Sequence, residues 1–482
     1  MAGRFRQPTL RAMARDLKAS PSEAATAAFR ANFRGEIIRP GDETYDRARH
    51  VFNGMIDRRP ALIARPRGAV DVIAAVNLAR DNDLPLAVRC GGHSLSGNSV
   101  CDDGLLIDLS HMKGVRVDPA ARTARANAGV LWGEFDRETQ LFGLATPGGR
   151  VTTTGLGGFT LGGGYGWISP KFGLTCDNLV SADVVTADGR LVTASERENA
   201  DLFWGLRGGG GNFGIVTSYE FRLHPLGPIV LGGLLIYSIE QGREVARAYR
   251  EYVEQAPDEL ATALAVLTGP PEPFVPEHLQ GKPVFGIAVL YAGPPGEAEG
   301  VVGPLKRLGP PAVDLVQPMP YVAFQAILDP TAPWGLHVYA RGEHLTGLTD
   351  EVIDAMLDYG AEISSSSPWS QTIIFRHGGA VARVPDGATA FSHRADAYLA
   401  HPIAAWENPA DTDRHLDWIR RYSAALRPAT TGGVYLNFEP DGDEEEMRAG
   451  YGTEKYARLA ALKARWDPRN LFHFNQNIKP RP

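Results

Sequence analysis

The 482-residue sequence lacks several features that would place it in a common class of protein. It has no apolar run close to the roughly 20 residues that span a bilayer. The N-terminal residues 1–6 are not followed by the apolar core of a secretory signal. The net charge is −7, so the basic excess typical of nucleic-acid-binding proteins is also missing. These absences predict a cytoplasmic protein with no membrane and no nucleic-acid partner.

Cysteine is scarce, and the histidines do not form a recognisable metal motif. Cys90, Cys101 and Cys176 are odd in number and have neither disulfide-framework nor zinc-site spacing. The 12 histidines include no His-x-x-x-His pair flanking a glutamate. We therefore expect reduced, buried thiols and no metal centre.

Glycine, by contrast, is plentiful, and it gathers in three segments. The chain has 54 glycines, above the average usage of about 7%. They concentrate in residues 88–97, where His93 follows a predicted strand, and in residues 155–166 and 207–216. Glycine lets backbone N–H groups approach an anionic ligand closely. Three such loops predict a site for a large anionic cofactor, most simply a dinucleotide pyrophosphate.

Three familiar sites do not fit these loops. Residues 155–158 lack the preceding strand and the acidic residue about 20 positions later that a Rossmann fingerprint needs. No Gly-Lys-Ser/Thr follows any cluster, which excludes a P-loop. The serine motif of α/β-hydrolases is also absent from them.

The chain is too long for a single core, and its pattern predicts two domains. The Pro- and Gly-rich residues 225–228 mark the expected boundary, and Asp188-Gly189 predicts a hairpin turn. Before the boundary we expect helices at 11–35, 69–80 and 130–135, and strands at 62–64, 86–88, 105–109, 123–128, 179–186 and 191–194. After it we expect strands at 234–237 and 284–290, and helices at about 240–255, 295–308, 350–361 and 454–466. Strands covered by helices on one face predict an α+β fold.

Four motifs, taken together and in order, resemble one known family. They are residues 89–94, 155–166, 207–216 and 470–478. The set resembles the PCMH-type FAD-binding domain of the vanillyl-alcohol-oxidase superfamily, and within it the berberine-bridge-enzyme-like and 6-hydroxy-D-nicotine-oxidase-like FAD-linked oxidases. The resemblance covers about residues 40–480. It implies a discontinuous FAD-binding domain (1–227 and 440–482, PCMH-type core about 56–227) and an α+β substrate domain (228–439), whose antiparallel sheet is covered by helices.

The resemblance also implies how FAD is held. A loop histidine carries the flavin 8α-methyl in this family, and here it is His93. Some members add a cysteinyl bond at the position of Val151, so we expect one covalent link and regard Cys176 as a small buried hydrophobe. Thr154 matches a position near the reactive edge of the flavin, where a small residue leaves room for O2. Leu95 replaces a tyrosine that is common after the His-Ser pair. The other implied cofactor residues are Arg89, Cys90, Gly91, Gly92, Ser94, Gly155, Gly157, Gly158, Gly163, Gly164, Gly166, Asn178, Gly214, Ile215, Val216, Asn475 and Asn477.

The catalytic residues follow from a further motif. Tyr435 and Asn437 resemble the family's Tyr-x-Asn strand, and on a strand both would share one face. Tyr435 can act as a general base only if a neighbour stabilises its phenolate, and Arg383 or His393 is the cation expected to do so. The glutamate base of the plant enzymes would fall in residues 378–384, at the position of Arg383, which puts a plant-type mechanism in doubt.

The predicted function is therefore an FAD-dependent oxidase that takes hydride from a C–H bond next to oxygen or nitrogen of a small organic substrate. Electrons would pass to O2, releasing hydrogen peroxide. Two alternatives stay open: a flavin dehydrogenase with another acceptor, and a flavin-binding protein without turnover. The sequence identifies neither the substrate nor the oligomeric state.

Overall fold

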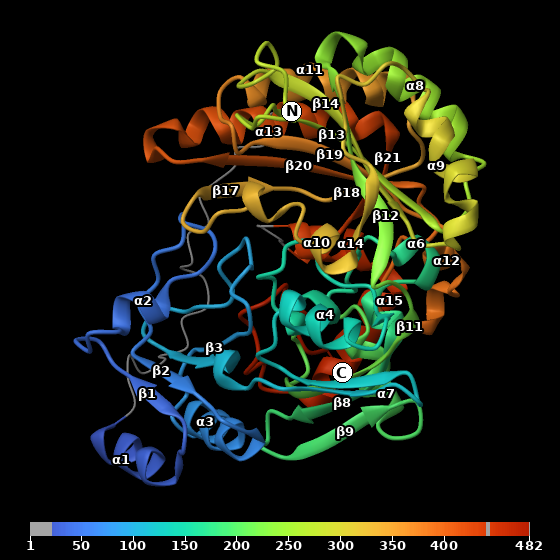
Figure 1. The fold of residues 1–482 in the computed structure, drawn as a ribbon. Helices are drawn as coiled ribbons and strands as arrows, with labels where there is room; N and C mark the ends of the chain where they lie inside the picture. The colour runs from blue at the N-terminus through green and yellow to red at the C-terminus, as the bar shows by residue number, and fades with distance from the viewer. Residues whose placement is uncertain (1–21, 440–443, 482) are drawn as a thin grey trace.

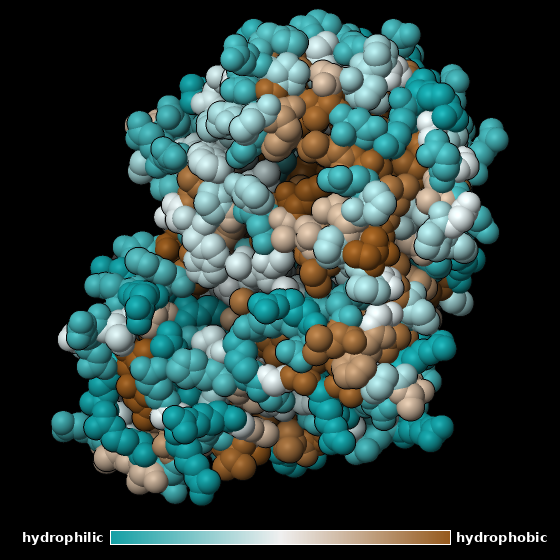
Figure 2. Space-filling view, viewed as in Figure 1, coloured by the Kyte–Doolittle hydropathy of each residue, from teal (hydrophilic) through white to brown (hydrophobic). Residues whose placement is uncertain are grey.

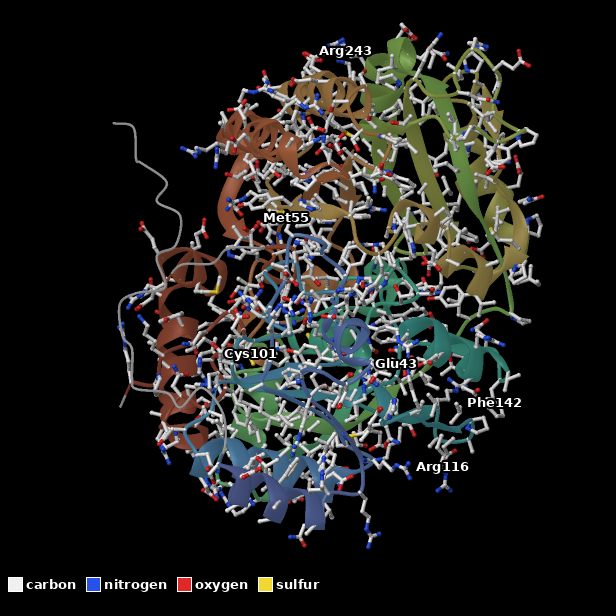
Figure 3. All side chains as sticks on the ribbon, turned by 90° about the vertical axis from the view of Figure 1, so that its left-hand side faces the viewer. Glu43, Met55, Cys101, Arg116, Phe142 and Arg243 are labelled. Carbon is white, nitrogen blue, oxygen red and sulfur yellow. The ribbon has the colours of Figure 1, made fainter. Side chains whose placement is uncertain are left out.

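The computed structural model describes residues 22–439 and 444–481. These residues form one large sheet, two smaller sheets and a two-stranded sheet (Figure 1). The small sheets and their helices form the lower half of the view, and the large sheet forms the upper half. In Figure 3, turned by 90°, Cys101 and Arg116 lie in the half built on the small sheets. Arg243 lies at the far end of the half built on the large sheet. Met55 belongs to the first half of the chain but packs against the core of the large sheet, where the halves meet.

The first small sheet has four strands in the order β1-β2-β4-β3. Its strands are β1 (Glu36–Ile38), β2 (Leu62–Arg65), β4 (Leu105–Asp108) and β3 (Leu86–Arg89). Strands β2, β4 and β3 are parallel, and β1 is antiparallel to β2. The helix α3 (Ala69–Asp81) links β2 to β3 as the apolar spacing predicts, but β4 lies between these two strands. The histidine loop begins where β3 ends.

The second small sheet is antiparallel, with the order β5-β6-β10-β8-β9. Its strands are β5 (Val115–Asp118), β6 (Thr123–Asn127), β10 (Ile215–Arg222), β8 (Leu179–Val185) and β9 (Leu191–Ser195). The predicted hairpin at Asp188-Gly189 is confirmed, because β8 and β9 pair across it. A two-stranded sheet joins β7 (Leu144–Ala145) to β11 (His224–Pro225). The third glycine-rich segment runs directly into β10.

The large sheet has ten strands, and every pair of neighbouring strands in it is antiparallel. Along its main path the strands are β15 (Val313–Asp314), β12 (Ile229–Ser238), β14 (Pro283–Tyr291), β13 (Leu260–Thr268), β19 (Gln371–Arg376), β20 (Tyr398–Trp406), β18 (Glu343–Leu345) and β21 (Thr430–Val434). Two more strands pair at its sides: β16 (Gln317–Pro320) with β12, and β17 (His337–Ala340) with β20.

Long helices cover one face of the large sheet, as Figure 1 shows at the top of the molecule. They are α8 (Gly242–Val253), α9 (Ala298–Lys306), α11 (Asp350–Ser364) and α13 (Thr412–Leu426). Strand residues alternate between the faces. Ile374 and Ala404 join the core under the helices, whereas Ile373 and Phe375 face the other way. The α+β prediction, with helices over one face, is confirmed.

The remaining helices pack around the small sheets or join the halves. They are α1 (Glu23–Asn32), α2 (Tyr45–Arg49), α4 (Trp132–Gln140), α5 (Leu156–Leu161), α6 (Ser169–Phe172), α7 (Ala200–Leu206), α10 (Tyr321–Gln325), α12 (Ala380–Arg383), α14 (Glu444–Tyr451) and α15 (Thr453–Trp466). Part of the helix predicted at 11–35 lies outside the described residues, and the helix predicted at 130–135 begins at Trp132 and continues to Gln140. Helix α15 returns to the small-sheet half, where it contacts α7.

The surface and the described helices agree with the composition. In Figure 2 most of the viewed face is hydrophilic, and apolar side chains gather in a recess of its upper half. Among the described residues, no helix is long and apolar enough to cross a membrane. The same part of the chain contains no group of three or more side chains suited to a metal ion.

Candidate active site

One cavity of about 400 Å³ lies between the glycine loops and the uncovered face of the large sheet. The loops contribute backbone from each of the three glycine-rich segments. Strands β17, β19 and β20 contribute the opposite wall, and the C-terminal segment closes one side with Phe472, Phe474, Asn475 and Gln476. The three glycine-rich segments, far apart in sequence, therefore line one cavity. The predicted cofactor residues on its wall are Cys90, Gly91, Gly92, His93, Ser94, Leu95, Thr154, Gly155, Gly157, Gly158, Gly214, Ile215, Val216 and Asn475.

His93 lies on the cavity wall in a defined orientation. Its Nε2 is 2.8 Å from Oγ1 of Thr153, just before the second glycine-rich segment, and its ring stacks on Phe52 with centroids 4.4 Å apart. The edge of the Trp334 ring contacts it at 5.7 Å. Burial lowers the pKa of His93 to about 4, so the imidazole is neutral at pH 7. A neutral imidazole has a ring nitrogen with a free electron pair, which is what bond formation to an electrophile requires.

The first two glycine loops touch through their backbones. A Cβ built on Gly91 would lie 2.2 Å from the backbone nitrogen of Gly155, and a Cβ on Gly155 would lie 2.2 Å from that of Gly91. No side chain fits between them at this distance, so glycine is required at both positions. The Cys90 thiol beside them donates to the carbonyl of Ala128 at 2.7 Å, and burial raises its pKa to about 11. Cys90 is thus a protonated packing residue.

The C-terminal segment is fixed to the third glycine loop. The Asn475 side chain donates to the carbonyl of Gly211 at 3.1 Å, and the Asn212 side chain donates to that of Gln476 at 3.1 Å. The buried Lys463 of α15 donates to the Asn212 carbonyl at 2.7 Å and pairs with Asp467 at 2.7 Å. These bonds bring a segment more than 250 residues away to the cavity wall.

Six predicted cofactor residues do not line the cavity: Arg89, Gly163, Gly164, Gly166, Asn178 and Asn477. Arg89 pairs with buried Asp108 at 2.6 Å and so fixes the end of β3. The Asn178 amide donates to two loop carbonyls, of Phe172 and Leu174, and its oxygen lies 2.6 Å from a ring nitrogen of His224. These two residues hold the surrounding backbone and do not face the cavity, so their predicted contact with the cofactor stays a prediction.

Tyr435 and Asn437 lie together, but not on a strand. Strand β21 ends at Val434, and residues Leu436–Phe438 form a 3-10 turn closed by the Phe438 N–H on the Tyr435 carbonyl (2.8 Å). The predicted strand is wrong because this turn interrupts the alternation. The two side chains still meet, since the Asn437 amide donates to the Tyr435 hydroxyl at 3.0 Å.

The Tyr435 hydroxyl is an acceptor in a closely packed corner. It receives a second bond, from the backbone N–H of Tyr165, at 3.0 Å. Burial raises the pKa of Tyr435, whereas these two donors and the charge of Arg150 favour the phenolate and act in the opposite direction. Tyr435 is 1% exposed and stands directly behind the wall residues Asn437 and Tyr165.

Neither cation predicted beside Tyr435 is there. Arg383 is 64% exposed and pairs with Asp258 at 2.6 Å. His393 lies 3.5 Å from Asp396 and stacks on His344, away from the cavity wall. The prediction is wrong because α12 carries Arg383 to the surface, and contacts with Asp396 and His344 hold His393 elsewhere. Arg150 is the cation that acts on Tyr435, and its only signal in the sequence was a charge inside a glycine-rich stretch.

The sheet side of the cavity is largely apolar. Alternation brings Gln371, Ile373 and Phe375 of β19, and His401, Ile403 and Ala405 of β20, to this wall. Among the described lining residues Glu439 is the only carboxylate, and the sequence reasoning missed it. Glu439 pairs with Arg341 at 3.2 Å and accepts from the Gly342 N–H at 3.0 Å, and burial raises its pKa to about 7.

Comparisons with known proteins agree with this geometry. Residues 60–195 match the model of an FAD binding domain, and residues 434–479 match the model described as berberine and berberine like. An FAD-linked oxidoreductase of Dictyostelium discoideum is 33% identical over 461 residues, which are 94% of this chain and 96% of that protein.

Two solved structures are similar along nearly the whole chain. One is 6-hydroxy-D-nicotine oxidase from Arthrobacter nicotinovorans, with a TM-score of 0.84 and 29% identity, covering 93% of this chain and 98% of the other. The second is a glucooligosaccharide oxidase from Acremonium strictum with 6-S-cysteinyl, 8α-N1-histidyl FAD (TM-score 0.83, 26% identity, 95% and 99% covered). Together with the two matched domains, these relatives show that the chain belongs to the berberine-bridge-enzyme-like family of FAD-linked oxidases and is an FAD-dependent oxidoreductase.

Proposed function

We propose that this protein oxidises a small organic substrate by removing hydride from a C–H bond beside an alcohol oxygen or an amine nitrogen, with O2 as electron acceptor and hydrogen peroxide as product. The observation that carries the proposal is this cavity, which has cofactor-type glycine loops on one side and an apolar sheet wall on the other. FAD held by the glycine loops would supply the hydride acceptor and the route for electrons to O2. The protein supplies position, a base and the exclusion of water.

The loops have the form that FAD needs. A Cβ built on Gly158 or Gly211 would meet no atom within 4 Å, and both residues line the cavity. Their backbones therefore face open space, where N–H groups reach an anionic ligand without hindrance.

We further propose that residues 1–227 and 440–482 form the cofactor-binding domain and residues 228–439 the substrate domain.

His93 is the residue proposed to carry the flavin. Its neutral ring, its place on the wall and its bond to Thr153 support a single link to the 8α position. Val151 lies on the same wall where the two-link pattern needs a cysteine. The structural relative with both histidyl and cysteinyl links supports the histidyl half of that pattern for this chain, and Val151 excludes the cysteinyl half at this position.

In its phenolate form, Tyr435 is proposed as the base that takes the substrate's O–H or N–H proton, which it must reach between the wall residues Asn437 and Tyr165. Its oxygen accepts two N–H bonds, which stabilise negative charge there. The apolar residues of β19 and β20 keep water from the site, so that these bonds act in a low dielectric.

Cys90, Cys101 and Cys176 are all unpaired, which supports the proposed cytoplasmic location.

Flavin reduction without air, followed by exposure to air, tests the function. A panel of alcohols and amines is mixed anaerobically with the purified protein, and bleaching at about 450 nm is recorded. An oxidase recovers its colour on mixing with O2 and forms one peroxide per flavin. Recovery with a quinone but not with O2 would indicate a dehydrogenase, and no bleaching by any member of a broad panel would contradict turnover.

Acid precipitation tests the link separately. The flavin of the parent protein should stay with the pellet, whereas that of His93→Ala should appear in the supernatant. His111→Ala is the matched control, because His111 is exposed and lies outside the cavity. Peptide mass mapping that finds flavin on any cysteine would overturn the single link.

A further inference from the structure

Arg150 brings an uncompensated positive charge to the cavity wall. It is the only arginine or lysine among the described residues that line the cavity. Its side chain is buried, with 8% of the residue exposed, and no ion pair to it occurs within residues 22–439 and 444–481. Its Nε has no hydrogen-bond partner. A buried guanidinium without an acid is unusual, because burial of an unpaired charge is costly.

Three aromatic rings hold this guanidinium in place. Its central carbon lies 3.6 Å from the ring centroid of Phe375, 4.5 Å from that of Tyr165 and 5.1 Å from that of Trp167. Phe375 comes from the inner face of β19, Tyr165 lies within the second glycine-rich segment, and Trp167 directly follows that segment. Cation–π attraction stabilises the charge without neutralising it. Burial lowers the pKa of Arg150 to about 10, so the side chain stays protonated at neutral pH.

No other group facing the cavity neutralises Arg150. Glu439 is engaged by Arg341. His401, on the wall, and His377, behind it, are neutral because burial lowers their pKa to about 3 and about 4, and the charge of Arg150 contributes to both shifts. His93, the other histidine on the wall, is neutral as well, because burial lowers its pKa to about 4. The described part of the cavity thus offers one fixed cation to whatever enters it.

We propose that Arg150 binds an anionic group of the substrate, a carboxylate or an ionised hydroxyl, carried on an apolar body. This inference rests on the proposed function and names its substrate class. The guanidinium offers a planar fork of donors that matches such an anion. The apolar body would lie against Ile373, Ile403 and Ala405, which face the same space. Alcohols or amines that carry no anion would then be poor substrates.

Binding of a simple aromatic anion tests this without requiring turnover. The holoprotein is titrated with benzoate, and with benzamide as its neutral counterpart, by calorimetry and by the flavin difference spectrum. The parent should bind benzoate about 10- to 100-fold more tightly, the range of a hydrogen bond to a charged group. Arg150→Met should abolish the preference, and Arg150→Lys should retain part of it. In Arg383→Met, the matched surface control, the preference should be unchanged.

Two results would overturn the proposal. One is a parent protein that shows no preference for benzoate. The other is an Arg150→Met variant that keeps the preference but loses FAD or shifts the flavin potential, which would assign Arg150 to the cofactor. Thermal unfolding checks the variants, and Arg150→Met is expected to fold because it removes an unpaired buried charge. Calorimetry does not depend on O2 or on flavin reduction, so failure of the oxidase proposal is recognised separately.

Discussion

Replacing Tyr435 with phenylalanine tests whether the buried hydroxyl takes a proton or only completes the packing. The ring contacts Phe438 and Phe391, with centroids 4.7 and 6.1 Å away, and phenylalanine keeps those contacts. The change removes only the oxygen that accepts from the backbone N–H of Tyr165 and the side chain of Asn437, each at 3.0 Å. Two effects should follow, and they differ in size and in readout.

The stability effect comes from the two donors left without an acceptor. A buried polar group that loses its partner costs about 1–3 kcal/mol. Asn437 keeps its bond to the Phe159 carbonyl (3.1 Å), so the loss should fall mainly on the Tyr165 N–H. The catalytic effect is larger. General-base help is worth about 10²–10⁴-fold, or about 3–5 kcal/mol of activation free energy.

Anaerobic stopped-flow reduction measures the second effect, and urea unfolding measures the first. The variant should reduce its flavin about 10²–10⁴-fold more slowly with any substrate that the parent accepts, while retaining FAD. Tyr422→Phe is the matched control, because its hydroxyl is buried without a partner in the core below the helices. If Tyr435→Phe loses stability but reduces its flavin as fast as the parent, the hydroxyl is structural and the proposed base is wrong.

Three further changes test other parts of the structure. Gly155→Ala would place a Cβ 2.2 Å from the backbone nitrogen of Gly91, so it should lower the free energy of unfolding by about 1–3 kcal/mol and lower FAD occupancy. A Cβ on Gly68 would meet no atom within 4 Å, so Gly68→Ala should have neither effect. Equal thermal shifts in the two variants would contradict the close loop contact. Lys463→Met leaves Asp467 buried without its cation and should lower the free energy of unfolding, measured in urea, by about 3–5 kcal/mol. An unchanged urea midpoint would show that the Lys463–Asp467 pair does not hold the C-terminal segment. Burial lowers the pKa of His377 from 6.5 to about 4, so the unfolded state binds the proton first and the stability of the fold decreases as the pH falls through that range. Between pH 7 and pH 5, His377→Asn should therefore lose about 2 kcal/mol less unfolding free energy than the parent. Parallel curves of unfolding free energy against pH would contradict the shift.

The cofactor loops were predictable because their function lies in the backbone. Glycine at positions 91 and 155 is needed for a contact that no side chain permits, and such a requirement is visible as a local pattern. The hairpin at Asp188-Gly189 is likewise a local event, and it formed as expected. The order of the large sheet was not predictable, since β13 pairs with β19 across about 100 residues. Period-2 alternation indicates which residues share a face, but not which strand lies beside which.

The residues on the substrate side of the cavity could not be predicted from local sequence patterns, because each of them comes from a different part of the chain. Arg150 meets Phe375 only because β19 places its inner face against the second glycine loop. Arg383 belongs to the same stretch of chain as Phe375, yet α12 carries it to the surface and to Asp258. Family motifs therefore locate the loops that line the cavity, because the spacing within each loop is local. They do not locate the substrate side, which depends on contacts between distant segments. For this chain it follows that specificity should change with Arg150 and with the inner residues of β19 and β20, while FAD attachment should respond to His93 and the glycine loops.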